Sequence, residues 1–252
     1  MKHINKTGAK IIALVALTVA CVSARAQLNG TYTVYGAGAN YADLQAAANA
    51  LSAGVSGPVT FRIRPGNWSD ASTSDAIIGN VSGASATNTI TFEAENGDAA
   101  TTTITNTNTS SSTTPSGGDG NFIFYLNGAK YIRVRNLTLN KTDNTYGNTV
   151  RFVGDADYNI IENCVLTGSS TTTTNTGKSR IYGTNLTDAN NNIITNNTIN
   201  YGSRGIFWEG NSSSSLSEDN EFSGNTFVSP YNYGIYTYYT ENMKMVKNTI
   251  TR

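Results

Sequence analysis

The sequence reads Val134-Arg135-Asn136-Leu137-Thr138-Leu139 near its middle, and this pattern returns four more times. The later copies occupy residues 161–166, 194–199, 222–227 and 245–250, at intervals of 27, 33, 28 and 23 residues. The first and last positions of every copy are apolar, as expected for side chains that face a common interior. A unit of this length cannot bury its apolar side alone, so the copies are expected to stack as coils.

The two middle positions of the pattern predict a bend and a buried polar row. The third position is Asn or Gly in four copies and Lys247 in the last, and Asn and Gly best tolerate the left-handed backbone region. The fourth position holds Asn197, Asn225 and Asn248 in the last three copies. Asparagines stacked about 4.8 Å apart can form a hydrogen-bonded asparagine ladder. Cys164 falls in the same column, which predicts a buried, unreactive thiol.

A third strand precedes each copy and carries aromatic residues. If isoleucines such as Ile181 and Ile206 in the neighbouring column point inward, the aromatics form an exposed stripe that suits the faces of sugar rings. The alternative is that the aromatics are the inward stack, and Arg151, which aligns with the isoleucines, favours it. The predicted carbohydrate-binding residues are the aromatic column with two flanking rings: Phe124, Phe152, Tyr182, Phe207, Trp208, Tyr236 and Tyr238.

The segment before the repeats predicts a helical cap. Apolar residues recur at helical spacing from Tyr41 to Leu51, with Asn40 as a possible N-cap and Gly54 as the end. A strand at 59–64 and a turn at 65–68 follow. The prediction is therefore an all-β chain: a right-handed parallel β-helix, a solenoid with an N-terminal capping helix at about 40–53 and coils over about 59–252. Because the last copy ends the sequence without a polar cap, we expect the solenoid to be truncated at its C-terminus.

The first 26 residues have the layout of a secretory signal peptide. Lys2, Lys6 and Lys10 precede an apolar run from Ile11 to Val22, and small residues stand before Gln27. The apolar run is too short to span a bilayer. Residues 27–252 are then the mature β-helix domain, without a membrane span. We expect it to be secreted, either extracellular or at the cell surface, and monomeric.

Removing this segment takes away the only histidine, His3, and leaves Cys164 as the only cysteine. A histidine-based triad, a histidine metal site and an intrachain disulfide are therefore excluded for the mature chain. The mature chain keeps 13 basic and 17 acidic residues, for a net charge of −4. This mildly acidic balance gives no electrostatic reason to expect nucleic acid as a partner.

The opening at 41–68 and the Gly-Ile-aromatic steps at Gly205 and Gly234 resemble right-handed parallel β-helix proteins of the pectate-lyase-like superfamily, of the secreted bacterial type. In that family a helix caps the first coil, and a strand ending in a Pro-Gly-x-aromatic turn begins the solenoid. The resemblance covers about residues 30–252. It specifies the fold better than the activity, because this fold hosts lyases, hydrolases, esterases, epimerases and adhesins.

The catalytic groups of these enzymes are hard to place here. The Gly-His-Gly step and paired aspartates of polygalacturonase-type hydrolases are missing, and the residues of pectin-esterase-type enzymes find no match. Pectate lyases use calcium and a basic residue, so Asp155 and Asp157 are weak candidates for sharing a cation, with Arg151 or Arg180 as the base. Solvated turn carboxylates are the alternative. We therefore expect no cofactor, with calcium relevant only to a lyase.

Two hypotheses remain. The first is a secreted or cell-surface β-helix protein, a glycan-binding or adhesin-like scaffold without catalysis, whose partner is a polysaccharide or cell-surface glycan. The alternative is a polysaccharide lyase or another carbohydrate-active enzyme that acts on uronic-acid polymers. An outward cluster of carboxylates beside a basic residue would favour the enzyme, and an aromatic stripe with scattered charges would favour binding.

Overall fold

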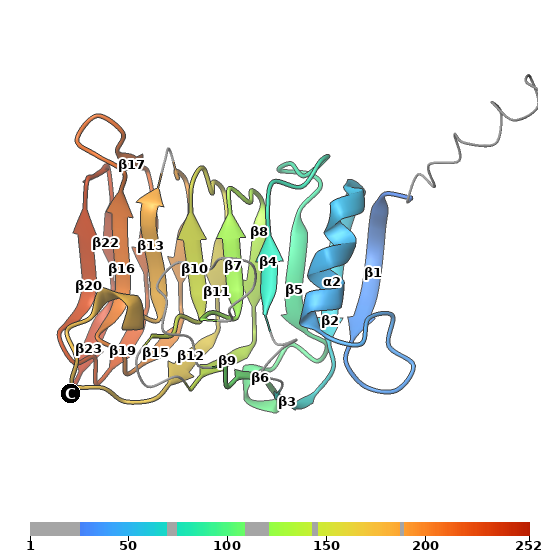
Figure 1. Ribbon diagram of the computed structural model, residues 1–252, viewed down its shortest axis with the longest axis horizontal. Helices are drawn as coiled ribbons and strands as arrows, with labels where there is room; N and C mark the ends of the chain where they lie inside the picture. Colours follow the sequence, from blue (N-terminus) through green and yellow to red (C-terminus); the bar gives the residue numbers. More distant parts are fainter. Residues whose placement is uncertain (1–25, 70–74, 109–120, 143–145, 187–188) are drawn as a thin grey trace, which may run out of the picture.

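The chain is a right-handed parallel β-helix, as the sequence predicts (Figure 1). The computed structural model describes residues 26–69, 75–108, 121–142, 146–186 and 189–252. The predicted signal peptide therefore lies almost entirely outside the described residues. Within the described part, no helix has the length and apolar character needed to cross a membrane.

Three parallel sheets run along the molecule. Sheet A contains β1 (Leu28–Val34), β2 (Val55–Ile63), β5 (Ile90–Ala94), β8 (Ile132–Arg135), β11 (Ile160–Glu162), β14 (Ile193–Thr195), β18 (Glu221–Ser223) and β22 (Lys244–Val246). Sheet B contains β3 (Gly66–Ser69), β6 (Thr102–Asn106), β9 (Thr138–Lys141), β12 (Val165–Gly168), β15 (Thr198–Asn200), β19 (Thr226–Val228) and β23 (Thr249–Thr251). Sheet C contains β4 (Ala76–Ile78), β7 (Phe124–Asn127), β10 (Val150–Val153), β13 (Ile181–Leu186), β16 (Arg204–Gly210) and β20 (Tyr233–Tyr238).

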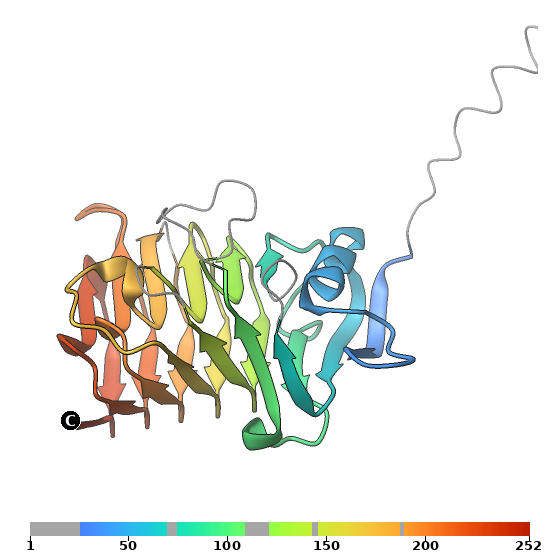
Figure 2. The same ribbon diagram turned by 60° about the horizontal axis from the view of Figure 1, so that its bottom comes forward.

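A complete coil takes one strand from sheet A, one from sheet B and one from sheet C, whereas β1 at one end and β22 with β23 at the other belong to turns without a strand in all three sheets. Figure 2 shows the strands of successive coils side by side in rows, from the helical end of the molecule to the C-terminus. Two short strands, β17 (Ser217–Glu218) and β21 (Thr240–Glu241), pair with each other between sheet C and sheet A. The single-turn helices η2 (Ala99–Thr101) and η3 (Thr176–Lys178) lie in connections between strands.

The six-residue repeat is the corner between sheets A and B. Its first position pairs from coil to coil through Val134, Ile161, Ile194, Phe222 and Met245, as the alignment predicts. Its third position has positive φ in every copy: 55° at Asn136, 54° at Asn163, 55° at Asn196, 64° at Gly224 and 56° at Lys247. Even Lys247 adopts the left-handed conformation, because the corner geometry is imposed by the strands on either side of it.

The fourth position of the repeat points inward. The Asn197 side-chain amide donates to Asn225 Oδ1 at 3.0 Å, and that of Asn225 donates to Asn248 Oδ1 at 3.2 Å. The backbone N–H of Cys164 donates to Asn197 Oδ1 at 2.9 Å, and the Cys164 side chain is buried. These buried amides therefore satisfy one another and the backbone between coils.

Aromatic rings fill the interior between the three sheets. Phe61 stacks on Phe92 at 4.8 Å between ring centroids, and Phe92 meets Phe124 edge-to-face at 5.2 Å. In later coils Trp208 contacts Phe152 and Phe222 edge-to-face, and its indole N–H donates to Ser217 Oγ at 2.8 Å. Edge-to-face pairs of this kind add to the stability gained from burial.

The helical end differs from the prediction in its details. The helix α2 spans Leu44–Ala50 and continues as the single turn η1 (Leu51–Ala53), so the cap begins later than residue 40. Asp43 is the N-cap, since its carboxylate accepts from Ala46 N at 2.7 Å. Asn40 instead accepts from Thr33 N at 2.8 Å, and this bond ties the loop to β1. The strand β1, which pairs with β2, was not predicted.

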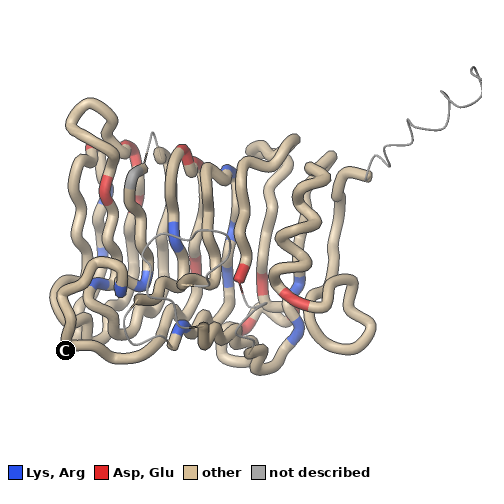
Figure 3. Tube along the Cα trace, viewed as in Figure 1, with Lys and Arg blue, Asp and Glu red and all other residues tan. Residues whose placement is uncertain are grey.

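Charged residues are sparse along the coils, as Figure 3 shows. The ion pairs that the described residues make lie mainly on the outer face of sheet A. There Arg135 binds Glu93 at 2.7 Å and Glu162 at 3.9 Å, and Lys244 binds Glu221 at 2.9 Å. The outer face of sheet C carries stacked aromatic rings instead of the ion pairs found on sheet A.

Candidate functional site

The outer face of sheet C carries a column of stacked side chains, but the sequence alignment is wrong by one residue at β7 and at β10. Val150 pairs with Phe124 on one side and Ile181 on the other, and Arg151 pairs with Tyr125 and Tyr182. The sequence alignment places Arg151 with Ile181 instead. A one-residue slip exchanges the two faces of a strand, so it moves the aromatic residues of β7 and β10 to the wrong side.

Three of the predicted carbohydrate-binding residues lie in the interior. Phe124, Phe152 and Trp208 are fully buried and belong to the aromatic core described above. The other four, Tyr182, Phe207, Tyr236 and Tyr238, lie on the outer face, because the isoleucines Ile181 and Ile206 beside them point inward. The structure thus brings together only part of the predicted set.

We call the outward column the sheet C stack: Tyr125, Arg151, Tyr182, Phe207 and Tyr236, one residue per coil. The guanidinium of Arg151 lies 5.8 Å from the ring centroid of Tyr125 and 5.0 Å from that of Tyr182. Tyr182 and Phe207 stack at 5.2 Å. Phe207 and Tyr236 stack at 5.4 Å with only 2° between their ring planes.

A second arginine covers the later part of this stack. The Arg204 guanidinium lies 5.5 Å from the ring centroid of Phe207, 5.3 Å from that of Tyr236 and 5.6 Å from that of Tyr233. Its Nη1 donates to the backbone oxygen of Thr174 at 2.9 Å, which ties the segment before η3 to this face. Cation–π contacts of this kind hold the guanidinium flat against the rings.

Exposure is concentrated at one end of the stack. Tyr182 and Phe207 are only 7% and 5% exposed, because neighbouring side chains cover their faces, whereas Tyr233 is 47% and Tyr238 is 48% exposed. Tyr236 is half-buried between them. The accessible surface is therefore a tyrosine platform at β20, with Arg204 beneath it.

Sequence reasoning missed Tyr125, Tyr233 and Arg204 as members of this face. One signal could have corrected β10: an arginine is rarely buried in an apolar interior, so Arg151 belongs on the outer face. Tyr125 enters the column only when β7 is also shifted by one residue, in the opposite direction. Arg204 carries no comparable signal, because it lies at the bend where β16 begins.

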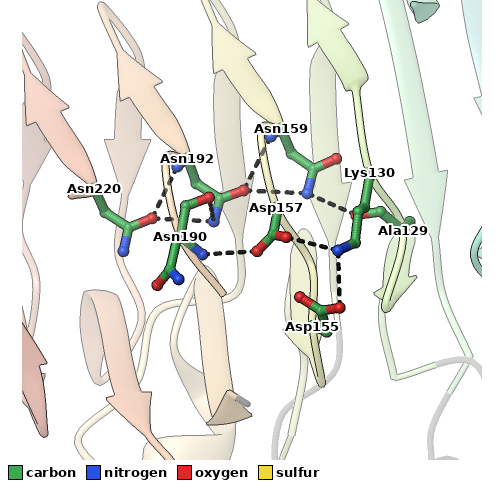
Figure 4. A network of polar contacts seen from close by, with 8 residues as sticks. All are labelled: Ala129, Lys130, Asp155, Asp157, Asn159, Asn190, Asn192 and Asn220. Carbon is green, nitrogen blue, oxygen red and sulfur yellow. Dashed lines mark hydrogen bonds and ion pairs between the residues drawn. The ribbon is translucent and has the colours of Figure 1, made fainter. Parts of the chain in front are cut away.

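The turn carboxylates Asp155 and Asp157 both bind the side chain of Lys130 (Figure 4). Lys130 Nζ donates to Asp155 Oδ2 at 2.8 Å and to Asp157 Oδ2 at 2.7 Å. These two hydrogen bonds raise the pKa of Lys130. Asp157 also accepts from Asn190 N at 2.9 Å, so it links three consecutive coils. The described residues contain no cluster of three or more potential metal ligands.

A second series of buried asparagines runs beside this lysine (Figure 4). The amide of Asn159 donates to Asn192 Oδ1 at 3.1 Å and to the backbone oxygen of Ala129 at 2.9 Å. The amide of Asn192 donates to Asn220 Oδ1 at 3.0 Å. The sequence alignment covers the corner between sheets A and B and misses this series at the corner between sheets C and A. Both corners use the same chemistry to align successive coils.

Arg180, the other arginine considered as a base, is fully buried and holds backbone oxygens. Its guanidinium donates to Asn200 O at 3.1 Å, Ser169 O at 2.8 Å and Lys141 O at 3.4 Å. Burial lowers the pKa of Arg180 to about 10, which still leaves it protonated at neutral pH. These contacts connect the segment after β12 to neighbouring coils. They indicate that Arg180 stabilises the fold and does not act as a base.

Comparisons with known proteins show the fold alone. No protein-family model matches the chain, and no curated protein sequence is similar to it. Among solved structures, a pectin methyl esterase of the rice weevil has a TM-score of 0.54 at 17% identity, over 94% of this chain and 69% of that one. Escherichia coli YbhC has a TM-score of 0.53 at 15% identity, over 81% of this chain and 57% of that one. The chain thus spans little more than half of the E. coli protein, and its likeness to both is that of a shared parallel β-helix.

Proposed function

We propose that this protein is a secreted or cell-surface β-helix that binds a polysaccharide through the outer face of sheet C. The observation that carries the proposal is the tyrosine platform at β20, where Tyr233, Tyr236 and Tyr238 lie on the outer face of the last described strand of sheet C. Rings held in fixed orientations bind the apolar faces of sugars without losing side-chain freedom on binding. The extracellular location comes from the predicted signal peptide.

The charges on this face favour an acidic glycan. The strands of sheet C carry two arginines, Arg151 and Arg204, and one carboxylate, Glu209. Arg204 lies against the rings of Tyr233 and Tyr236, so a sugar stacked on either ring comes close to a positive charge. A guanidinium recognises carboxylates through paired hydrogen bonds. The rice weevil protein of the same fold is a pectin methyl esterase, and pectin is a carboxylate-bearing polymer, which supports the same class of ligand.

Retention on insoluble glycans tests the proposal. We expect the purified protein to be retained by insoluble uronate polymers, and Tyr236→Ala to reduce the retention about tenfold, because it removes the ring that joins Phe207 to Tyr233. Tyr201→Ala is the control, since it removes an exposed tyrosine ring (39%) that lies outside sheet C. Equal retention of wild type and Tyr236→Ala would contradict the proposal.

The enzymatic alternative, a polysaccharide lyase, makes a different prediction. Lyases produce unsaturated sugars that absorb in the ultraviolet, whereas we expect no rise in absorbance when the protein is incubated with polygalacturonate or alginate, millimolar calcium and alkaline buffer. The supporting observation is that Asp155 and Asp157, the candidate calcium ligands, are occupied by Lys130. A steady rise that a chelator abolishes would establish the lyase instead.

A further inference from the structure

The outer face of sheet A contains a recess that lies apart from the sheet C stack. It has a volume of about 200 Å³ and is lined by Ala86, Thr89, Tyr131, Arg133, Tyr158, Ile160, Asn191 and Ile193. The side chains of Ile160 and Ile193 come from neighbouring strands, β11 and β14, and are half-buried. The recess thus combines an apolar surface with aromatic rings, an amide and a guanidinium.

Tyr131 and Tyr158 form a stacked pair of rings at unusual backbone positions. Their rings stack at 5.1 Å between centroids with 4° between planes. Tyr131 has φ of 61° and Tyr158 has φ of 56°, a region in which bulky side chains are strained. The next coils place Asn191, Asp219 and Asn242 at this corner, also with positive φ, and these residue types tolerate the conformation better. The aromatic rings are therefore present despite the backbone preference.

The charge in the lining of the recess is positive. Arg133 is its only charged residue, and among the described residues Arg133 makes no ion pair. Arg135, two residues further along β8, is by contrast held by Glu93 and Glu162. A half-exposed guanidinium without an ion pair, beside a stacked pair of tyrosine rings, favours an anionic ligand with an apolar face.

We propose that this recess is a second glycan subsite, which binds one uronic-acid residue. The apolar face of the sugar packs on the stacked rings of Tyr131 and Tyr158, its carboxylate pairs with Arg133, and Asn191 hydrogen-bonds to a hydroxyl group. The subsite rests on the outer face of sheet A alone and is independent of binding at sheet C.

Titration calorimetry with tri-galacturonate tests the subsite, with uncharged maltotriose as the comparison. The measurements are made in a Tyr236→Ala background, so that the sheet C stack does not dominate the signal. The informative variants are Tyr158→Asn and Arg133→Gln. Tyr158→Asn places at this corner the residue type of Asn191, so it removes the ring without disturbing the backbone. Tyr201→Asn is the matched control, because Tyr201 has φ of 60° and lies at another corner.

We expect binding of tri-galacturonate, at least tenfold weaker binding of maltotriose, and at least a tenfold loss of tri-galacturonate affinity in both Tyr158→Asn and Arg133→Gln. Tyr201→Asn should change the affinity less than twofold. The absence of binding, equal affinity for the two sugars, or an affinity unchanged by Tyr158→Asn would overturn the proposal. Retention of the wild-type protein on insoluble glycans would be unaffected by such a failure, so the two proposals can be judged separately.

Discussion

At the scale of single residues, Cys164 shows how burial controls reactivity. Its side chain is buried, and its thiol faces the backbone oxygens of Glu162 at 3.3 Å and Val134 at 3.7 Å. Burial is the main reason why the pKa of this thiol rises from 9.0 to about 12. The thiolate is the nucleophile, so the native protein holds almost none of it at neutral pH.

We therefore predict that a thiol reagent at pH 8 labels Cys164 only after denaturation. Because the folded-state pKa lies above the unfolded one, the stability of the fold falls as the pH rises from about 9 toward 12. Cys164→Ser should weaken this loss of stability at alkaline pH. At pH 7 it should lower the free energy of unfolding by only about 1–2 kcal/mol, because the serine hydroxyl can donate to Glu162 O. Thermal melts of both proteins between pH 7 and 11 measure the effect. Rapid labelling of the native protein would contradict the prediction.

Lys130 gives a second test at this scale. It neutralises two carboxylates that lie in one turn, so Lys130→Met leaves Asp155 and Asp157 with unbalanced charge. We expect a loss of about 1 kcal/mol at pH 7, a modest value because the site is partly exposed. The loss should shrink near pH 3, because burial raises the pKa of Asp157 and this carboxyl group is protonated there. Denaturant melts at the two pH values check this, and a loss that is the same at both would contradict the charge argument.

At the scale of the repeating element, the corner between sheets A and B depends on one left-handed residue per coil. Asn163, with φ of 54° and an exposed side chain, isolates this backbone effect from packing. We predict that Asn163→Ala costs about 1 kcal/mol, because alanine lacks the short polar side chain that lets asparagine tolerate the left-handed region, and that Asn163→Gly costs less, because glycine has no Cβ to clash there. Chemical denaturation of the two variants gives the comparison. A larger cost for glycine than for alanine would show that the corner does not require this conformation.

At the scale of the whole molecule, the solenoid should tolerate the removal of one coil but not of half a coil. Ile193 pairs with Ile160 on one side and Glu221 on the other, so deleting residues 193–220 joins Asn192 to Glu221 and brings Glu221 opposite Ile160. Asn192 then occupies the place of Asn220, its partner in the same buried series. Each coil contacts mainly its neighbours, which is why the shortened stack can remain continuous.

We predict that this deletion variant stays soluble and rich in β-sheet, with a lower melting temperature than the wild type. Deleting residues 193–206 is the control, because it removes only part of a coil and puts every later strand opposite the wrong sheet. Circular dichroism and size-exclusion chromatography distinguish the two. If both variants aggregate, or both fold, the modular description of the stack is wrong.

The sequence by itself determined the coil repeat, the left-handed corner, the inward asparagines and the helical cap. These features depend on the spacing of apolar residues and on the few residue types that accept a special backbone conformation, and both can be read along the chain. The sheet C stack, the Lys130 bridge and the recess on sheet A were decided by the tertiary structure. They depend on which residue lies opposite which in the next coil, and the loops between coils vary in length. Slips of one residue at β7 and at β10 were enough to exchange the inner and outer faces of these strands, and so to place Phe124 and Phe152 on the surface when they belong to the core.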